Sequence, residues 1–155
     1  MTILRRADQE ESTPMPGGKS LTMAGASTGA GMATVGDLTV DPGVRSGYHL
    51  HPNTEEAIFV VEGEMEFRLG GARFRASAGD CVLAPKGIGH GLENVGDSPA
   101  RVITIYPTAE PEREGLEDVE YTDGNPGPTV FVRSNSEPYE FMTGVARYDM
   151  VGDFS

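Results

Sequence analysis

Apolar and polar residues alternate one by one in the middle of the chain, which is the pattern of a half-buried β-strand. Between residues 64 and 69 the polar positions are Glu64, Glu66 and Arg68, and the apolar positions are Met65, Phe67 and Leu69. This strand is predicted to have one wet face and one buried face. Gly70 and Gly71 follow it and predict a hairpin turn, because glycine tolerates positive φ angles. A return strand around Phe74 is expected next.

Other short apolar runs are separated by turn residues such as Gly79-Asp80 and Pro85-Lys86-Gly87. They predict strands at 32–40, 49–51, 56–61, 81–84, 90–94 and 101–106, and two more strand-like runs at 130–133 and 145–150. Many short strands at regular spacing predict an all-β fold, either a closed barrel or two packed sheets. The glycine-rich stretch 25–31 is expected to be a loop before the first of these strands.

The run from Ala57 to Val61 is apolar on both faces. A strand of this kind is covered on both sides. One cover is the barrel interior, and the other is a further layer or a second subunit. The simplest arrangement that provides the second cover is a homodimer, which we therefore predict.

Length and charge limit the classes of partner. With 155 residues the chain has the size of one domain that can bury a core without disulfide bonds. Its net charge of -12 argues against nucleic acid as a partner, because phosphate contacts rely on clustered cationic side chains. Much of the acidity is local, since residues 109–123 carry seven acidic side chains and one arginine. This stretch is expected to be a solvated loop, with a helical turn near Leu116–Val119.

The single cysteine, Cys81, cannot form an intramolecular disulfide. It is expected to be a small buried side chain in a strand. The first residues do not read as a charged leader with an apolar run, and no stretch approaches the ~18 consecutive apolar residues of a membrane span. These features predict a cytoplasmic protein that is not inserted in a membrane.

All three histidines of the chain take part in one pattern with a carboxylate. His49 and His51 are two residues apart, Glu56 follows five residues later, and His90 lies in a second cluster. Imidazole and carboxylate groups suit first-row transition metals. On a strand, His49 and His51 point to the same face and can share one ion. Glu56 can face them from the next strand, whereas Glu55 projects away and is the weaker candidate.

The residues around these four positions carry a family resemblance. Residues 43–63 read GVRSGYHLHPNTEEAIFVVEG and residues 79–94 read GDCVLAPKGIGHGLEN. Both segments resemble the two sequence motifs of the cupin superfamily. In that family the residues that correspond to His49, His51, Glu56 and His90 ligate a metal inside a small β-barrel. The resemblance implies an all-β, cupin-type double-stranded β-helix, or jelly-roll barrel, with N- and C-terminal extensions.

Together with the strand pattern, the resemblance divides the chain into four parts. These are an N-terminal extension (1–30), the cupin barrel core (31–108), an acidic linker or loop (109–128), and C-terminal strands (129–155) that pack on the barrel or on a neighbouring subunit.

The proposed ligand set limits the reactions that the metal can support. Four protein ligands leave positions free on a six-coordinate ion but fill the shell of a tetrahedral zinc. We expect one divalent metal per chain, with iron, manganese, nickel, cobalt, copper and zinc as candidates. The resemblance favours an oxygenase that acts on a small enolic, phenolic or thiol substrate chelated at the metal. Two alternatives stay open: a non-redox lyase, isomerase or cyclase that uses the metal as a Lewis acid, and a cupin that binds a small molecule without turnover.

The sequence assigns no general acid or base, because all three histidines are expected to bind the metal. Tyr48 and Tyr106 are expected to pack as aromatic residues first and to donate protons second. Asn94 is expected to make structural hydrogen bonds. An arginine near the barrel mouth is the natural anchor for an anionic substrate. The polar residues that the spacing leaves without a role are Arg45, Glu93 and Arg101.

Overall fold

The structure is a computed structural model that describes residues 3, 5–124 and 130–150. This part of the chain is nearly all β, and its helices are three single 3-10 turns: η1 (Arg6–Asp8), η2 (Ala26–Thr28) and η3 (Arg133–Asn135). The predicted all-β fold is confirmed. Residues 125–129 of the predicted linker and residues 151–155 of the predicted C-terminal strands lie outside the described residues.

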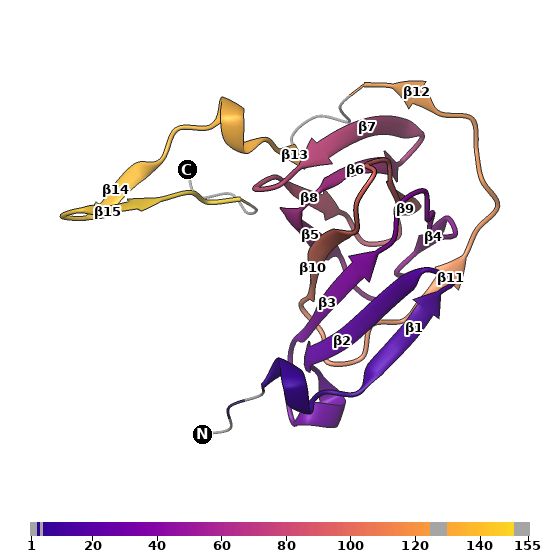
Figure 1. The fold of residues 1–155 in the computed structure, drawn as a ribbon, viewed down its shortest axis with the longest axis horizontal. Helices are drawn as coiled ribbons and strands as arrows, with labels where there is room; N and C mark the ends of the chain where they lie inside the picture. Colours follow the sequence, from indigo (N-terminus) through magenta and orange to yellow (C-terminus); the bar gives the residue numbers. More distant parts are fainter. Residues whose placement is uncertain (1–2, 4, 125–129, 151–155) are drawn as a thin grey trace.

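Two sheets form the body of the molecule (Figure 1). The first has the strand order β1 (Glu11–Met15), β2 (Gly18–Ala24), β3 (Thr34–Val40), β10 (Ala100–Tyr106), β5 (Glu56–Glu62), β8 (Cys81–Ala84) and β13 (Val130–Phe131). The second has the order β11 (Glu114–Gly115), β4 (His49–Leu50), β9 (His90–Asn94), β6 (Glu64–Leu69), β7 (Ala72–Ser77) and β12 (Thr122–Asp123). The chain changes sheet at most connections between β4 and β10, as in a jelly roll. A separate hairpin consists of β14 (Tyr139–Met142) and β15 (Val145–Arg147).

The core lies between the two sheets and is built from alternate residues of each strand. Phe67 and Met65 are its largest fully buried side chains, and the rings of Phe67 and Phe74 stack with centroids 5.9 Å apart. On β5 the core face carries Ile58 and Val60. The opposite face of β5 is only partly covered in the single chain, so the predicted homodimer stays a prediction.

Arg68 was predicted to be exposed to solvent on the polar face of its strand, but it is only 2% exposed. Its guanidinium donates to the carbonyl of Ser46 (2.6 Å) and to the carboxylate of Asp118 (2.8 Å). Asp118 belongs to the acidic stretch, which lies across this face of the second sheet. The alternation along β6 predicted correctly on which face of the strand Arg68 lies. The predicted exposure was wrong, because a distant segment of the chain covers Arg68 there.

Two further differences concern irregular parts of the sequence. The N-terminal extension contains the hairpin β1–β2, which was not predicted and which extends the first sheet beside β3. Residues 116–121 form no regular element, so the predicted helical turn near Leu116–Val119 is wrong. The flanking strands β11 and β12 pair with β4 and β7, and this pairing holds the stretch between them in an extended path.

None of the helices in the described ranges has the length and apolar character that a membrane crossing requires.

The buried carboxylate of Asp37 joins the N-terminal segment to the barrel. It lies on β3 at 1% exposure and accepts two hydrogen bonds from Arg101 of β10, at 2.8 and 2.7 Å, and a further one from Arg6 of η1. The hydrogen bonds from Arg101 lower the pKa of Asp37 below 3.8. Because the folded-state pKa is depressed, this contribution to stability is present above the unfolded pKa and is lost as the pH falls through the folded one.

Asp37→Asn is expected to lower the free energy of unfolding near neutral pH by about 1–3 kcal/mol, since two guanidinium groups lose their counter-charge. Urea unfolding of wild type and variant from neutral to acidic pH measures this difference, which should shrink towards acid. Equal unfolding free energies near neutral pH contradict the assignment.

Candidate metal centre

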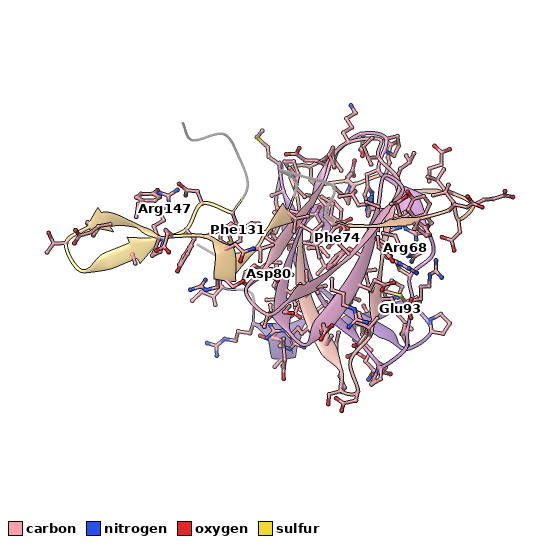
Figure 2. The ribbon with its side chains drawn as sticks, turned by 90° about the horizontal axis from the view of Figure 1, so that it is seen from above. Arg68, Phe74, Asp80, Glu93, Phe131 and Arg147 are labelled. Carbon is pink, nitrogen blue, oxygen red and sulfur yellow. The ribbon has the colours of Figure 1, made fainter. Side chains whose placement is uncertain are left out.

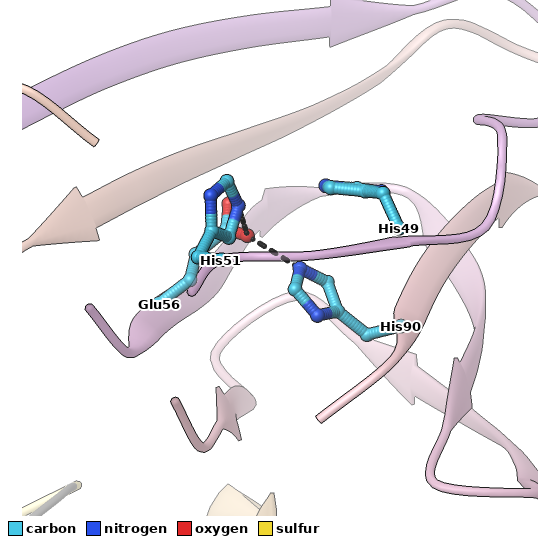
Figure 3. A group of neighbouring side chains, drawn as sticks. All are labelled: His49, His51, Glu56 and His90. Carbon is cyan, nitrogen blue, oxygen red and sulfur yellow. Dashed lines mark hydrogen bonds and ion pairs between the residues drawn. The ribbon is translucent and has the colours of Figure 1, made fainter. Parts of the chain in front are cut away.

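Four potential ligands meet where the two sheets face each other (Figure 3). His49 lies in β4 and His51 follows that strand, while His90 begins β9 and pairs directly with His49. Glu56 begins β5 in the other sheet. Each residue offers one donor atom, and these four atoms all lie within 4.8 Å of one another. The structure thus brings together the four residues that the sequence singles out.

Backbone carbonyls fix the orientation of each imidazole. The Nδ1 atom of every ring lies within hydrogen-bond distance of a carbonyl oxygen: His49 with Gly47 (2.9 Å), His90 with Ile88 (2.9 Å) and His51 with Glu112 (2.5 Å). A carbonyl oxygen only accepts, so each Nδ1 carries a proton and each neutral ring presents an Nε2 lone pair. Metal-binding histidines commonly have this arrangement, which sets the tautomer and orients the donor atom.

The inward-facing nitrogen and oxygen atoms of the cluster lie close together. The Nε2 atoms of His90 and His51 lie 2.8 and 3.3 Å from Oε2 of Glu56. The Nε2 atom of His51 is also buried without a hydrogen-bond partner. Lone pairs that face a carboxylate repel it unless a proton or a cation lies between them. The cluster of three histidines and one glutamate therefore suits a divalent metal ion.

The charge of the cluster is set by burial and by its own hydrogen bonds. Burial raises the pKa of Glu56, but the interactions of its carboxylate with His51, His90 and Tyr106 outweigh it and lower that pKa to about 2. Burial, and secondarily the electrostatic interaction with the neighbouring His90 ring, lowers the pKa of His49 to about 4. Burial also acts to lower the pKa of His51, but the Glu56 carboxylate outweighs it and the pKa is raised above 6.5. The carboxylate is therefore ionised at neutral pH and attracts a cation.

Comparison with known proteins places the barrel in a family. Residues 36–106 match the family described as "Cupin domain". Protein SchB of Streptomyces halstedii is 35% identical over 103 residues, which make up 66% of this chain and 72% of SchB. The chain belongs to the cupin superfamily. The resemblance of its two motifs to those of cupins is confirmed.

Two other relatives of this cupin are named as polyketide synthase proteins. CurC of Streptomyces cyaneus is 36% identical over 93 residues, covering 59% of this chain and 60% of CurC. The tetracenomycin polyketide synthase protein TcmJ of Streptomyces glaucescens is 30% identical over 95 residues, covering 61% of this chain and 64% of TcmJ. The matches span less than two thirds of the length of CurC and of TcmJ.

Solved structures support the cupin fold. The polyketide cyclase RemF of Streptomyces resistomycificus superposes with a TM-score of 0.65 at 22% identity, over 77% of this chain and 88% of RemF. Oxalate decarboxylase OxdC of Bacillus subtilis, a protein with Mn(II) centres, superposes with a TM-score of 0.63 at 26% identity, over 71% of this chain and 30% of OxdC. The predicted jelly-roll architecture is confirmed.

A cavity of about 260 Å³ opens beside the four donors of this cupin. The three histidines and Glu56 belong to its lining. The apolar side chains of the lining are Pro14, Met15, Leu38, Ile58 and Leu92. The hairpin β1–β2, which sequence analysis missed, thus supplies part of the cavity wall.

Tyr106 and Arg113 also line the cavity. The Tyr106 hydroxyl donates to Oε1 of Glu56 at 2.6 Å, and burial together with the Glu56 charge raises the pKa of this phenol. Tyr106 therefore contacts the cluster directly, although sequence analysis assigned it a packing role first. Arg113 was missed. The signal that points to it is its position as the one cation among seven acidic residues.

The acidic residues 109–123, which we call the strap, bring Arg113 to the cavity. Backbone pairing of β11 with β4 places Glu114 and Gly115 beside the strand that carries His49. Beyond β11, the amide of Leu116 donates to the carbonyl of Tyr48 (2.9 Å). Three side chains then bind the carboxylate of Asp118, namely Arg45, Arg68 and Tyr121. Before Arg113, the amide of Glu112 donates to the side-chain oxygen of Asn53 (3.0 Å), so the strap is held on both sides of Arg113.

The remaining sequence candidates lie away from the cavity. Arg101 binds Asp37 and Arg45 binds Asp118. Neither they nor Glu93 are among the described residues that line the cavity.

Two of the structural roles expected from the sequence are confirmed. Asn94 is fully buried and donates to the carbonyls of Val40 and Ser98, both at 2.8 Å. Cys81 is buried in β8, where desolvation raises the pKa of its thiol to about 11. A thiol in that state is a packing group at neutral pH.

Glu56→Gln is expected to weaken the binding of Mn(II) by about 10–100-fold, because it keeps the shape of the side chain and removes its charge. Isothermal titration of the metal-free full chain measures the affinity and the stoichiometry. Glu55→Gln is the matched control, since Glu55 is exposed on the same turn, and it should bind like wild type. Unchanged binding in Glu56→Gln rules Glu56 out as a ligand.

Proposed function

We propose that this cupin is a metal-dependent enzyme that closes a ring in a small, enolisable polycarbonyl compound without net oxidation. His49, His51, Glu56 and His90 are the proposed ligands of one divalent ion. The observation that carries the proposal is that these donors line an open cavity whose other titratable side chains, among the described residues, are a phenol and a guanidinium. Relatives named as polyketide synthase proteins support the substrate class.

The proton chemistry of the cavity favours a substrate that is itself acidic. The titratable side chains described in its lining are the four proposed ligands, Tyr106 and Arg113. With all four ligands engaged, no imidazole or carboxylate is left to act as a strong base. A carbon between two carbonyl groups loses its proton far more readily than a carbon beside one, so a 1,3-dicarbonyl compound suits this site.

A divalent ion in the cluster supplies Lewis-acid polarisation of a carbonyl oxygen when it is bound. Arg113 has the charge and the planar donors to hold the enolate or carboxylate end of the substrate. Tyr106 holds Glu56 in place through its hydrogen bond. It also retains a proton that it can give to the more basic alkoxide formed when the ring closes.

The apolar side chains of the lining suit the remaining carbon chain of such a substrate. A volume of about 260 Å³ lies slightly below the usual range for ligand pockets, ~300–1,000 Å³. Because the cavity is open, a longer chain can extend through its mouth. Ring closure joins an α-carbon to a carbonyl carbon and moves one proton from carbon to oxygen, so it needs no oxidant.

Oxygenation of a chelated enol or phenol, the function that the sequence favours, is the second candidate. It uses the same histidine and carboxylate donors, which also suit redox-active iron. The manganese centres of oxalate decarboxylase support Mn(II) as the first ion to test for either reaction. The two candidates differ in their need for dioxygen.

The full chain loaded with Mn(II) is expected to convert a linear 1,3,5-triketone into a cyclic product under argon, with the same rate constant as in air. Mass spectrometry should show a product with the mass of the substrate, or that mass less one water. Turnover that requires dioxygen and adds oxygen atoms overturns the cyclase proposal in favour of the oxygenase. Binding without product in either atmosphere supports a non-catalytic cupin.

Arg113→Met is expected to raise KM about tenfold, because a charged hydrogen bond to the substrate contributes on the order of 1.5 kcal/mol. Metal content should stay unchanged, since Arg113 is not a proposed ligand. Arg75→Met removes a cation that pairs with Glu64 on the second sheet and serves as the matched control. Equal KM values for both variants and wild type contradict the anchoring role.

A further inference from the structure

The strap joins the two edges of the second sheet. In the strand order of that sheet β11 is the first strand and β12 is the last. Residues 116–121 connect the two, so they cross the outer side of the sheet, where Arg68 of β6 lies. Figure 1 shows this segment along the side of the barrel, and Figure 2 shows Arg68 on the same side, away from the hairpin β14–β15.

Asp118 fastens the crossing segment to the sheet. Its carboxylate accepts hydrogen bonds from Arg45 and Arg68, both at 2.8 Å, and from the Tyr121 hydroxyl at 2.7 Å. The Arg68 guanidinium also lies 5.9 Å from the ring centroids of Tyr48 and Tyr121. Arg68 is buried, and a buried guanidinium is costly without a counter-charge. The carboxylate of Asp118 supplies that charge only while the strap is docked on the sheet.

Asn53 fastens the strap at a second point, before Arg113. Its side-chain amide donates to the carbonyl of Glu110 at 2.9 Å and accepts from the amide of Glu112 at 3.0 Å. The residues between the two fastening points are thus held from both ends. They include Glu112 and Arg113, which face the metal cluster and the cavity.

The imidazole of His51 depends on the strap for its orientation. Its Nδ1 atom lies 2.5 Å from the carbonyl oxygen of Glu112, which is 61 residues away in the sequence. The carbonyls that orient the other two imidazoles lie only two residues before each histidine. Those two contacts are local and persist when the strap moves. Release of the strap therefore frees the ring of His51 and leaves the other two rings in place.

We propose that Asp118 is a positioning residue for the metal centre: it keeps the strap docked and thereby holds the Glu112 carbonyl against His51. The inference rests on the proposed ligand set of three histidines and Glu56. An ion that needs His51 in its docked orientation binds the docked chain more tightly than the released one. Because a coupling free energy acts equally in both directions, a bound ion also keeps the strap docked.

Trypsin cleavage after Arg113 measures how often the strap is released. Arg113 is the one lysine or arginine between residues 102 and 132, and the next residue, Glu114, is paired with β4. Cleavage of a transiently opened segment follows the population of the open form. Saturating Mn(II) is expected to slow this cut in the full chain at least tenfold, as mass spectrometry of the fragments will show. Cleavage after Arg133, outside the strap, is the control and should keep its rate.

Isothermal titration of Asp118→Asn measures the coupling from the other side. The variant keeps the size of the side chain and removes the charge, so the Kd of Mn(II) is expected to rise about tenfold. Asp123→Asn is the matched control, because Asp123 pairs with the exposed Arg73 at the end of the strap, and it should bind like wild type. Asn53→Ala releases the other fastening point and should also raise the Kd.

The two measurements constrain each other. When docking is two-state and the wild-type strap is mostly docked, the protection of Arg113 by Mn(II) equals the full coupling factor. The increase in Kd in Asp118→Asn cannot exceed that factor. A larger increase means that Asp118 acts on the ion by another route, and this result overturns the proposed mechanism.

The visible spectrum of the Co(II)-loaded chain separates positioning from a general loss of stability. Outer partners of a ligating histidine tune the metal that it binds. At full occupancy the bands of Asp118→Asn are expected to differ from those of wild type, whereas the bands of Asp123→Asn should match them. Circular dichroism establishes that each variant is folded, and the wild-type cleavage rates decide the matter if Asp118→Asn is not.

These outcomes distinguish the positioning role from the metal centre itself. A wild-type chain that binds no Mn(II) overturns both. A chain that binds Mn(II) but is cut after Arg113 at the same rate with and without it overturns the positioning role alone. Wild-type affinity and wild-type Co(II) bands in a folded Asp118→Asn have the same consequence. None of these measurements depends on turnover, so they leave the proposed reaction to its own test.

Discussion

Each imidazole of this chain donates a hydrogen bond from Nδ1 to a backbone carbonyl, and this constraint turns three Nε2 atoms towards one carboxylate. Neutral donors and an ionised Glu56 repel one another in so small a volume unless a proton or a metal cation lies between them. The carbonyls belong to three separate segments, around Gly47, Ile88 and Glu112, so the orientation of the donors depends on the barrel and on the strap together. The fold positions a site that only a positive charge completes.

The strap links this site to the rest of the cavity. Glu112 fixes the ring of His51, and the next residue, Arg113, lines the cavity. Asp118 then ties the strap to the buried guanidinium of Arg68. One extended segment thereby orients a proposed ligand and supplies the proposed substrate anchor, which gives a physical reason for an arginine among so many acidic residues. The metal cluster and the anchor are parts of one arrangement.

The sequence alone predicts the strands from residue 56 to 106 and the four clustered residues, because both depend on local alternation and on short spacings. It does not predict which faces of the sheets are covered by segments that are distant in the sequence. Arg68 lies on the predicted side of its strand, yet Asp118 covers it from 50 residues away. Strand β1 is mostly exposed and β2 is placed by its pairing with β3, so the residues of β1 carry little amphipathic signal. Arg113 also reaches the cavity through contacts between segments that are distant in the sequence, here the pairing of β11 with β4.

The central claim is that three imidazoles and one carboxylate hold a divalent ion within the barrel. X-ray absorption at the metal edge, on protein purified from its own host, tests this claim most directly. We predict one metal per chain, with a first shell of nitrogen and oxygen atoms at about 2.0–2.2 Å and the outer-shell scattering of three imidazole rings. A substoichiometric metal content, or a first shell that contains sulfur or lacks imidazole scattering, would contradict it.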